Sequence, residues 1–308
     1  MSNRCLFRKI NRLFHFLPNG KFVPFHSNYF CSESLTTKMS KTVLITGASS
    51  GIGKATAIHL AQNGYKVYGA ARRAEKLQEL RKYGIEPISL DVTKDEYIVS
   101  CVNHILTASG RIDILINSAG LGSYGALEDV PMDEAKNQME INLFGATRLI
   151  QLVLPGMRKN HYGKIVNISS IGGKVGLPMG SWYHASKFAI EGLSDSLRNE
   201  VRQFGIDVIV IEPGGTKSEM VEIGSKELMR VSGQTAYAGL AKSLDKIYTA
   251  IEKSASDPIV IAKLIQKGIE AKNPKTRYIG GEMAKPMLFM RRMLSDKLFD
   301  RMLMRSMK

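Results

Sequence analysis

A tyrosine and a lysine four residues apart, Tyr183 and Lys187, are the residues of this sequence best suited to proton transfer. Residues four apart share one face of a helix, so a phenol and an ammonium group can meet there. A cation beside a phenol favours the phenolate, which makes a tyrosine of ordinary pKa ~10 usable as an acid or base nearer neutrality. Ser170 stands thirteen residues before Tyr183. Such a pair alone is typical of a solvated helical face, so its meaning depends on the other motifs.

A glycine-rich turn opens the ordered part of the chain at Thr46–Gly53. Gly47, Gly51 and Gly53 separate the apolar run Val43–Ile45 from an amphipathic stretch, so they lie between a predicted strand and a predicted helix. Small residues there let the backbone approach a pyrophosphate at the positive helix N-terminus. In this context the turn predicts a dinucleotide site, and with the tyrosine and lysine it indicates a redox active site.

The three motifs, in this order and at these separations, resemble those of the short-chain dehydrogenase/reductase family from about Lys41 to Gly281. The resemblance implies that Tyr183 exchanges a proton with the substrate oxygen, and that Lys187 lowers the tyrosine pKa and holds the nicotinamide ribose. It implies that Ser170 orients and polarises the carbonyl. It also implies that Asn142, in Ile-Asn-Leu-Phe-Gly, anchors a water leading from the lysine to solvent. The neighbouring Ser169 is excluded by the thirteen-residue separation.

The resemblance also implies a set of cofactor contacts spread over several turns. The predicted cofactor-binding residues are Gly47, Ser49, Ser50, Gly51, Ile52, Gly53, Arg72, Arg73, Asp91, Val92, Asn117, Ala119, Gly120, Tyr183, Lys187, Pro213, Gly214 and Thr216. Asp91 resembles the family residue that faces the adenine amino group. The sequence departs from the family pattern at two positions. Ser118 replaces the second Asn of the family's Asn-Asn-Ala-Gly turn, and Thr216 does not stand at the usual spacing after Pro-Gly.

The end of the second predicted strand indicates which dinucleotide is used. An NAD enzyme usually offers a carboxylate to the ribose hydroxyls at this point. The sequence here is Ala71-Arg72-Arg73, without an acid. Arg72 can pair with a 2′-phosphate as a planar, charged donor, and Arg73 is a second candidate. We therefore expect NADP(H) to be the preferred cofactor, with NAD(H) possible. The alternative is that both arginines are solvated surface charges.

Composition limits the other classes of function. The chain has 308 residues, a net charge of +15 and 44% hydrophobic residues, enough for one large core. The charge allows contact with phosphorylated ligands or anionic membrane, but no nucleic-acid motif accompanies it, and nucleic acid is not an expected partner. Three widely separated cysteines predict neither a disulfide framework nor a metal site. The sequence contains no run of 18 apolar residues, which argues against a transmembrane helix.

Short apolar runs alternate with helical patterns from Thr42 onward. Strands are predicted at Thr42–Thr46, Lys66–Ala71, Glu86–Asp91, Ile112–Asn117, Lys164–Ser169, Asp207–Ile211 and Arg277–Ile279. Helical stretches between them include Gly53–Gln62, Asp95–Ala108, Met132–Met157, Tyr183–Phe204 and Pro258–Ala271. Strands that return through helices predict an α/β, three-layer Rossmann fold with a doubly wound parallel seven-stranded sheet and helices on both faces.

The chain divides into three predicted parts. Residues 1–38 hold six Lys/Arg against one Glu, and they are expected to be a disordered or upstream-translated extension, with an organellar transit peptide as the alternative. Residues 39–281 form the catalytic domain. Residues 282–308 are expected to form a basic amphipathic helix that packs on the domain or on a second subunit, with peripheral membrane contact as the alternative. We expect a cytoplasmic homo-oligomer, dimer or tetramer, and organellar targeting stays open.

These features predict an oxidoreductase that transfers a hydride between a nicotinamide and a hydrophobic secondary alcohol, ketone or aldehyde. The resemblance implies that the substrate is selected by Lys217 to about Asp257, after the Pro-Gly turn, and by the loop Leu121–Leu127. In the first of these segments the apolar residues Met220, Val221, Met229, Val231 and Tyr237 favour such a substrate. The overall pattern resembles hydroxysteroid and retinol dehydrogenases and bacterial reductases alike. A 3-ketoacyl-type reductase and a non-catalytic dinucleotide sensor are the alternatives, and the four catalytic residues speak against the sensor.

Overall fold

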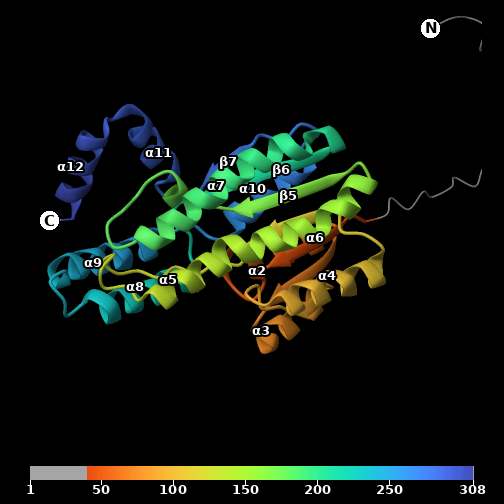
Figure 1. Ribbon diagram of the computed structural model, residues 1–308, viewed down its shortest axis with the longest axis horizontal. Helices are drawn as coiled ribbons and strands as arrows, with labels where there is room; N and C mark the ends of the chain where they lie inside the picture. Colours follow the sequence, from red (N-terminus) through yellow and green to blue (C-terminus); the bar gives the residue numbers. More distant parts are fainter. Residues whose placement is uncertain (1–39, 308) are drawn as a thin grey trace, which may run out of the picture. The chain divides into compact units, whose positions relative to one another are not determined.

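The computed structural model describes residues 40–307, and the predicted extension 1–38 lies outside the described residues. Seven strands form one sheet, in which every neighbouring pair is parallel. The strands are β1 (Thr42–Thr46), β2 (Lys66–Ala71), β3 (Glu86–Ser89), β4 (Ile114–Asn117), β5 (Gly163–Ile168), β6 (Ile206–Pro213) and β7 (Arg277–Gly280). Their order, β3-β2-β1-β4-β5-β6-β7, confirms the predicted doubly wound parallel sheet (Figure 1).

Helices connect the strands and cover both faces of the sheet (Figure 1). They are α2 (Gly51–Gln62), α3 (Ala74–Gln78), α4 (Asp95–Ser109), α5 (Met132–Met139), α6 (Gly145–Lys159), α7 (Ser181–Val201), α8 (Glu219–Ser232), α9 (Ala238–Ser254), α10 (Ile259–Glu270), α11 (Ala284–Met293) and α12 (Asp296–Ser306). One face packs against α4, α6 and α7, and the other against α2, α3 and α10. The three predicted layers are therefore present.

The alternation of side chains along β1 explains why two hydrophobic cores form. Val43 and Ile45 belong to the core beneath α2 and α10, whereas Leu44 belongs to the core beneath α4 and α6. Successive strand residues point to opposite faces, so a strand covered on both sides is apolar at every position. All five residues of β1 are buried, including the polar Thr42 and Thr46 at its ends.

Three parts of the helical structure differ from the predictions. The long stretch from Met132 is α5 and α6 joined by a π-helical turn at Glu140–Phe144. The segment after the Pro-Gly turn, predicted only as an apolar substrate region, contains α8 and α9. The tail is two helices and not one, because the backbone is extended at Leu294 and Ser295. Ser295 stands at the N-cap position of α12, where serine is favoured.

Candidate active site

A cavity of about 660 Å³ opens at the carboxyl ends of the parallel strands, where ligands of doubly wound folds bind. Most of the predicted site residues line it. They are Gly47, Ser49, Ser50, Gly51, Ile52, Gly53, Arg72, Arg73, Asp91, Val92, Ala119, Gly120, Ser170, Tyr183, Lys187, Pro213, Gly214 and Thr216. The cavity thus joins the predicted dinucleotide residues to the predicted catalytic residues, although segments far apart in the sequence supply them.

The glycine turn fits a dinucleotide because side chains have no room in it. Gly47 has φ +68°, and a Cβ there would lie 2.7 Å from the backbone oxygen of Ser118. A Cβ on Gly53 would lie 2.3 Å from the oxygen of Gly47. Thr46 Oγ1 accepts hydrogen bonds from the amides of Ser118 and Ala119, at 3.1 and 3.0 Å. The bare backbone at the start of α2 can therefore receive a pyrophosphate.

The two arginines after β2 differ in their surroundings. Arg72 is exposed at the cavity, and its charge helps to lower the pKa of Asp91. Burial raises that pKa, but hydrogen bonds from Thr93 together with Arg72 outweigh it. Arg73 donates to Ser49 Oγ at 3.1 Å and to Ser50 Oγ at 3.0 Å. Among the described residues, the Arg72 guanidinium therefore lines the cavity without a side-chain hydrogen bond, whereas the Arg73 guanidinium is already bonded to both serines.

Tyr183 and Lys187 both lie on α7 and line the cavity, where Lys187 is buried and Tyr183 is half-buried. Burial raises the pKa of Tyr183 above its usual value, and the polar side chain of Ser170 offsets this rise only in part. Burial also lowers the pKa of Lys187 to about 8, although the Glu191 charge opposes the effect. Lys187 Nζ donates to the Ile168 carbonyl at 2.9 Å and lies 5.8 Å from the Tyr183 ring centroid. The pKa of Tyr183 is therefore raised and not lowered, because burial of the phenol dominates and the Lys187 ammonium group is bonded to the Ile168 carbonyl of β5 and not to the phenol.

Ser170 lies at the turn after β5, between β6 and α7. Its Oγ accepts a hydrogen bond from the Gly172 amide at 3.0 Å and lies 3.5 Å from the Pro213 carbonyl, to which it donates. His184 binds the same turn through Nδ1 and the Gly172 carbonyl at 2.9 Å. Its Nε2 accepts from the Leu177 amide at 3.0 Å. His184 therefore orders the segment after Ser170, in keeping with the absence of a predicted catalytic role.

Two predicted site residues do not line the cavity. The side chain of Asn142 lies in the π-helical turn, accepts from the Leu121 amide at 2.8 Å and donates to the Leu121 carbonyl at 2.8 Å. It also donates to Ser186 Oγ at 2.9 Å. Asn117 is buried at the end of β4 and donates to Asn167 Oδ1 at 2.9 Å. Both side chains hold cavity walls in place, because their amides bind neighbouring segments and not the open space.

The end of β6 and the loop after it form another part of the cavity wall. Pro213, Gly214 and Thr216 all line it. Thr216 Oγ1 donates to the Gly214 carbonyl at 3.1 Å, so the hydroxyl stabilises the turn. A Cβ on Gly214 would lie 2.2 Å from the Glu282 carbonyl, which explains the glycine. The contact of Thr216 with a cofactor stays a prediction.

An apolar wall lies next to Tyr183 and is made by residues of the two segments predicted to select the substrate, although the sequence did not single out its tyrosines. The ring centroid of Tyr124 lies 5.5 Å from that of Tyr183 and 5.6 Å from that of Tyr248. Met220 and Val221, which the sequence did indicate, join Ile223 on the same wall. Tyr248 comes from α9, which no motif marks. An amphipathic period over 238–254 is the one signal that predicts a helix there, and it does not say which residue faces the cavity.

Comparison with known proteins agrees with the fold. A family model described as short chain dehydrogenase matches residues 41–228. The 3-ketodihydrosphingosine reductase of Bacteroides thetaiotaomicron is 39% identical over 237 residues, which cover 76% of this chain and 86% of the relative. Estradiol 17-beta-dehydrogenase 1 of Rattus norvegicus is 33% identical over 267 residues, covering 82% of this chain and 77% of the relative.

Solved structures lead to the same class. A short-chain dehydrogenase from Streptomyces avermitilis superposes with a TM-score of 0.72 at 33% identity, covering 82% of this chain and 92% of that chain. A metagenomic short-chain oxidoreductase in complex with NADP superposes with a TM-score of 0.63 at 26% identity, covering 78% and 96%. This chain therefore belongs to the short-chain dehydrogenase/reductase family. It is an oxidoreductase that acts on CH–OH groups with a nicotinamide dinucleotide.

Proposed function

We propose that this protein interconverts a hydrophobic ketone and the corresponding secondary alcohol with NADP(H), and that Tyr183 is its acid and base. The observation that carries the proposal is that the Tyr183 ring lies where the polar and apolar halves of one cavity meet. On one side are the glycine turn and Arg72. On the other are Tyr124 and Tyr248.

The residues around Tyr183 divide the work of reduction. The nicotinamide, when bound, supplies the hydride that adds to the carbonyl carbon. Ser170 and Tyr183 bind the carbonyl oxygen, which accepts the tyrosine proton as negative charge develops. Burial raises the pKa of Tyr183, so the phenol is protonated at neutral pH and ready to donate. Lys187 then stabilises the resulting phenolate by its charge.

Support for NADP(H) over NAD(H) comes from the end of β2. Arg72 lines the cavity there, and the residues that follow Ala71 in the sequence carry no carboxylate before Glu75. A ribose hydroxyl finds no acidic acceptor at that strand end, whereas a 2′-phosphate finds a guanidinium. We therefore propose that Arg72 reads the 2′-phosphate.

Within the hydrophobic ketones, a long-chain 3-keto lipid fits best. The cavity wall made by Tyr124, Tyr248, Met220 and Ile223 offers carbon and aromatic surface beside the reacting tyrosine. A relative at 39% identity is named 3-ketodihydrosphingosine reductase, which is a reductase of such a 3-keto lipid. A steroid is the second candidate, because a relative at 33% identity is named estradiol 17-beta-dehydrogenase 1.

The tail supports a lipid substrate through its exposed face. Phe289 and Met293 on α11 are each 65% exposed. The exposed Lys285 and Arg292 lie on the same helical face, four and three residues from Phe289. None of the helices within residues 40–307 is long and apolar enough to cross a bilayer. A basic and apolar face of this kind suits the surface of an anionic membrane.

A second copy of the chain suits this face less well. Positions 284–307 hold six Lys/Arg and two Asp, so two such faces repel one another. The tail also adjoins the substrate wall, because Met307 packs in one cluster with Met179 and Leu228, to which Tyr124 and Tyr248 are joined. We propose that α11 and α12 place the cavity at a membrane surface.

One assay separates these possibilities. NADPH oxidation is followed with a 3-keto sphingoid base, a 17-keto steroid and a small water-soluble ketone, each against wild type and Tyr248→Ala. We expect the sphingoid base to be the best substrate, and the tyrosine variant to raise its KM at least about tenfold, since a buried aromatic contributes roughly 1.5–3 kcal/mol. The small ketone serves as the control with unchanged KM. Equal losses for all three substrates, or no turnover of any, would overturn the assignment.

A further inference from the structure

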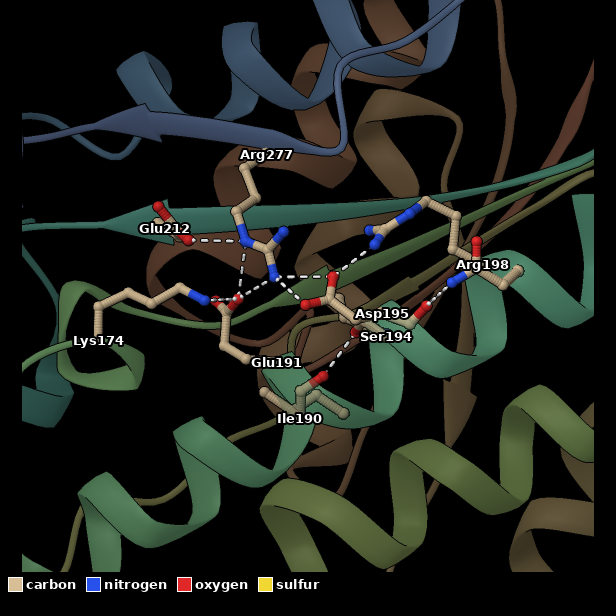
Figure 2. A network of polar contacts seen from close by, with 10 residues as sticks. Lys174, Ile190, Glu191, Ser194, Asp195, Arg198, Glu212 and Arg277 are labelled. Atoms are coloured by element: carbon tan, nitrogen blue, oxygen red, sulfur yellow. Dashed lines mark hydrogen bonds and ion pairs between the residues drawn. The ribbon is translucent and has the colours of Figure 1, made fainter.

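A cluster of charged side chains joins α7 to the last two strands of the sheet (Figure 2). Glu191 Oε2 on α7 accepts from Lys174 Nζ at 2.8 Å and from Arg277 Nε on β7 at 2.9 Å. Arg277 Nη2 also donates to both carboxylate oxygens of Asp195 at 2.8 Å. Arg198 donates to Asp195 at 2.6 Å. Lys174, Arg198 and Arg277 therefore form their ion pairs mainly with Glu191 and Asp195.

Glu212 on β6 lies in the same cluster and has poorer partners. Its side chain is 2% exposed, and that of Glu191 is 4% exposed. Arg277 Nε lies 3.2 Å from Glu212 Oε1, but its single hydrogen is directed to Glu191. Within residues 40–307, Glu212 Oε1 and Glu191 Oε1 are buried without a hydrogen-bond donor.

A single proton shared by the Glu191 and Glu212 carboxyl groups supplies the hydrogen-bond donor that these buried oxygens lack. A buried carboxylate without a donor is costly, whereas a protonated carboxyl can donate to its neighbour. The two side chains meet at Arg277 Nε, which lies 2.9 Å from Glu191 Oε2 and 3.2 Å from Glu212 Oε1. Burial, followed by the Glu191 charge, raises the pKa of Glu212 to about 7, although Lys174 and Arg277 oppose the rise. Two carboxyls that interact in this way titrate as a pair.

The pair lies next to the backbone segments that carry Ser170 and Lys187. Glu212 directly precedes Pro213, whose carbonyl accepts from Ser170. Glu191 is one helical turn after Lys187, and its charge favours the protonated lysine. A Cβ on Gly173 would lie 3.0 Å from Glu191 Cγ, so the turn that begins at Ser170 packs directly on the pair.

We propose that Glu191 and Glu212 share one proton, and that this shared proton holds Ser170, Lys187 and the end of β6 in their reactive arrangement. Both glutamates are positioning residues, because neither lines the cavity. The charged groups that face the pair are Lys174 from the turn after β5, Lys187 and Asp195 from α7, and Arg277 from β7. Loss of the proton places two like charges together and pushes β6 and α7 apart.

Glu212→Gln tests the proposal because glutamine keeps the shape and a donor but cannot lose the proton. With a titration at about 7, the protonated fraction falls roughly tenfold between pH 6 and pH 8. We expect kcat/KM of the wild type to fall accordingly. The variant should stay within about twofold of wild type at pH 6 and lack this fall. Glu200→Gln, on an exposed turn of α7, is the matched control and should keep the fall.

Infrared spectroscopy gives a second measurement that needs no substrate. The wild type should show a protonated-carboxyl band at pH 6 that disappears by pH 8, and Glu212→Gln should lack it. If the variant does not fold, the pH dependence of the wild-type band tests the proposal by itself. The pH profile rests on the proposed function, but the band does not, so a band without any carbonyl reduction counts against the proposed function only. Absence of the band in wild type, its persistence in the variant, or parallel pH profiles would overturn the shared proton.

Discussion

Arg73 donates a hydrogen bond to Glu219 at 2.6 Å across the mouth of the cofactor cavity. Glu219 begins α8, and its other carboxylate oxygen accepts from Lys76 at 2.5 Å. The same arginine contacts Ser49 and Ser50 of the glycine turn. An acidic side chain of the substrate region therefore holds cations at the cofactor end of the cavity, where a phosphate would compete for them.

Glu219→Gln removes that competition. We expect NADPH to bind up to about fivefold more tightly and NADH to change less than about twofold, because an exposed ion pair is worth roughly 1 kcal/mol or less. Titration of protein fluorescence with each cofactor at constant ionic strength measures both affinities. Weaker NADPH binding would show instead that Glu219 positions Arg73 for the phosphate.

Arg72→Ala tests the proposed reader of the 2′-phosphate. A charge-assisted hydrogen bond contributes about 1.5–3 kcal/mol, so NADPH affinity should fall roughly ten- to a hundredfold while NADH affinity is nearly unchanged. The control is Arg81→Ala, since Arg81 lies outside the cavity lining and bonds to Gln78. Equal losses for both cofactors would assign Arg72 to the fold.

Tyr183→Phe should remove turnover while NADPH still binds, because the change deletes the transferable proton and almost no volume. A loss of at least about a hundredfold in kcat is expected for general acid–base catalysis. The pKa of Tyr183 lies above 10, so the wild-type phenol is protonated through neutral pH. In the Glu212→Gln background, which lacks the proposed carboxyl titration, ketone reduction should therefore be flat near neutrality, whereas alcohol oxidation should accelerate as pH rises. Stopped-flow absorbance follows both directions, and substantial turnover by the phenylalanine variant would refute the mechanism.

Lys187→Met should separate stability from activity. The folded protein holds the pKa of Lys187 at about 8, below the ordinary 10.5. The unfolded chain binds the proton more tightly between these values, so the wild type gains unfolding free energy as pH rises from about 8 to 10.5. Methionine should remove this slope and stabilise the protein at pH 7 by up to about 2 kcal/mol, while activity is lost. Urea unfolding at several pH values is the measurement, and a destabilised variant at pH 7 would contradict it.

The exposed face of the tail is tested with lipid vesicles. Sedimentation with phosphatidylcholine vesicles, with and without phosphatidylglycerol, should show binding to the anionic vesicles only, and less of it at high salt. Phe289→Ser with Met293→Ser should weaken binding at least about tenfold, because both apolar side chains leave the interface. Tyr97→Ser, on an exposed site of α4, is the control. Equal binding of both variants, or a dimer that dissociates in the double variant, would reject the membrane face.

Much of this protein was determined by local sequence patterns. Apolar runs between amphipathic stretches were enough to predict a doubly wound parallel sheet. Gly47 and Gly53 were enough to predict where the dinucleotide-binding turn lies. The four-residue spacing of Tyr183 and Lys187 put both on one face of α7, as the helix period requires. These features depend on residues close together in the chain, so a single sequence contains them.

Tertiary structure decided what surrounds each of those residues. Burial between β5 and α7 reversed the expected effect on the Tyr183 pKa, because desolvation of the phenol exceeds any help from a lysine bonded to Ile168. Tyr124 and Tyr248 meet beside Tyr183 although α9 is far away in sequence. The partners of Glu212 come from other elements in the same way. Such contacts depend on how separate elements pack, and no local period or spacing records which side chains then come together.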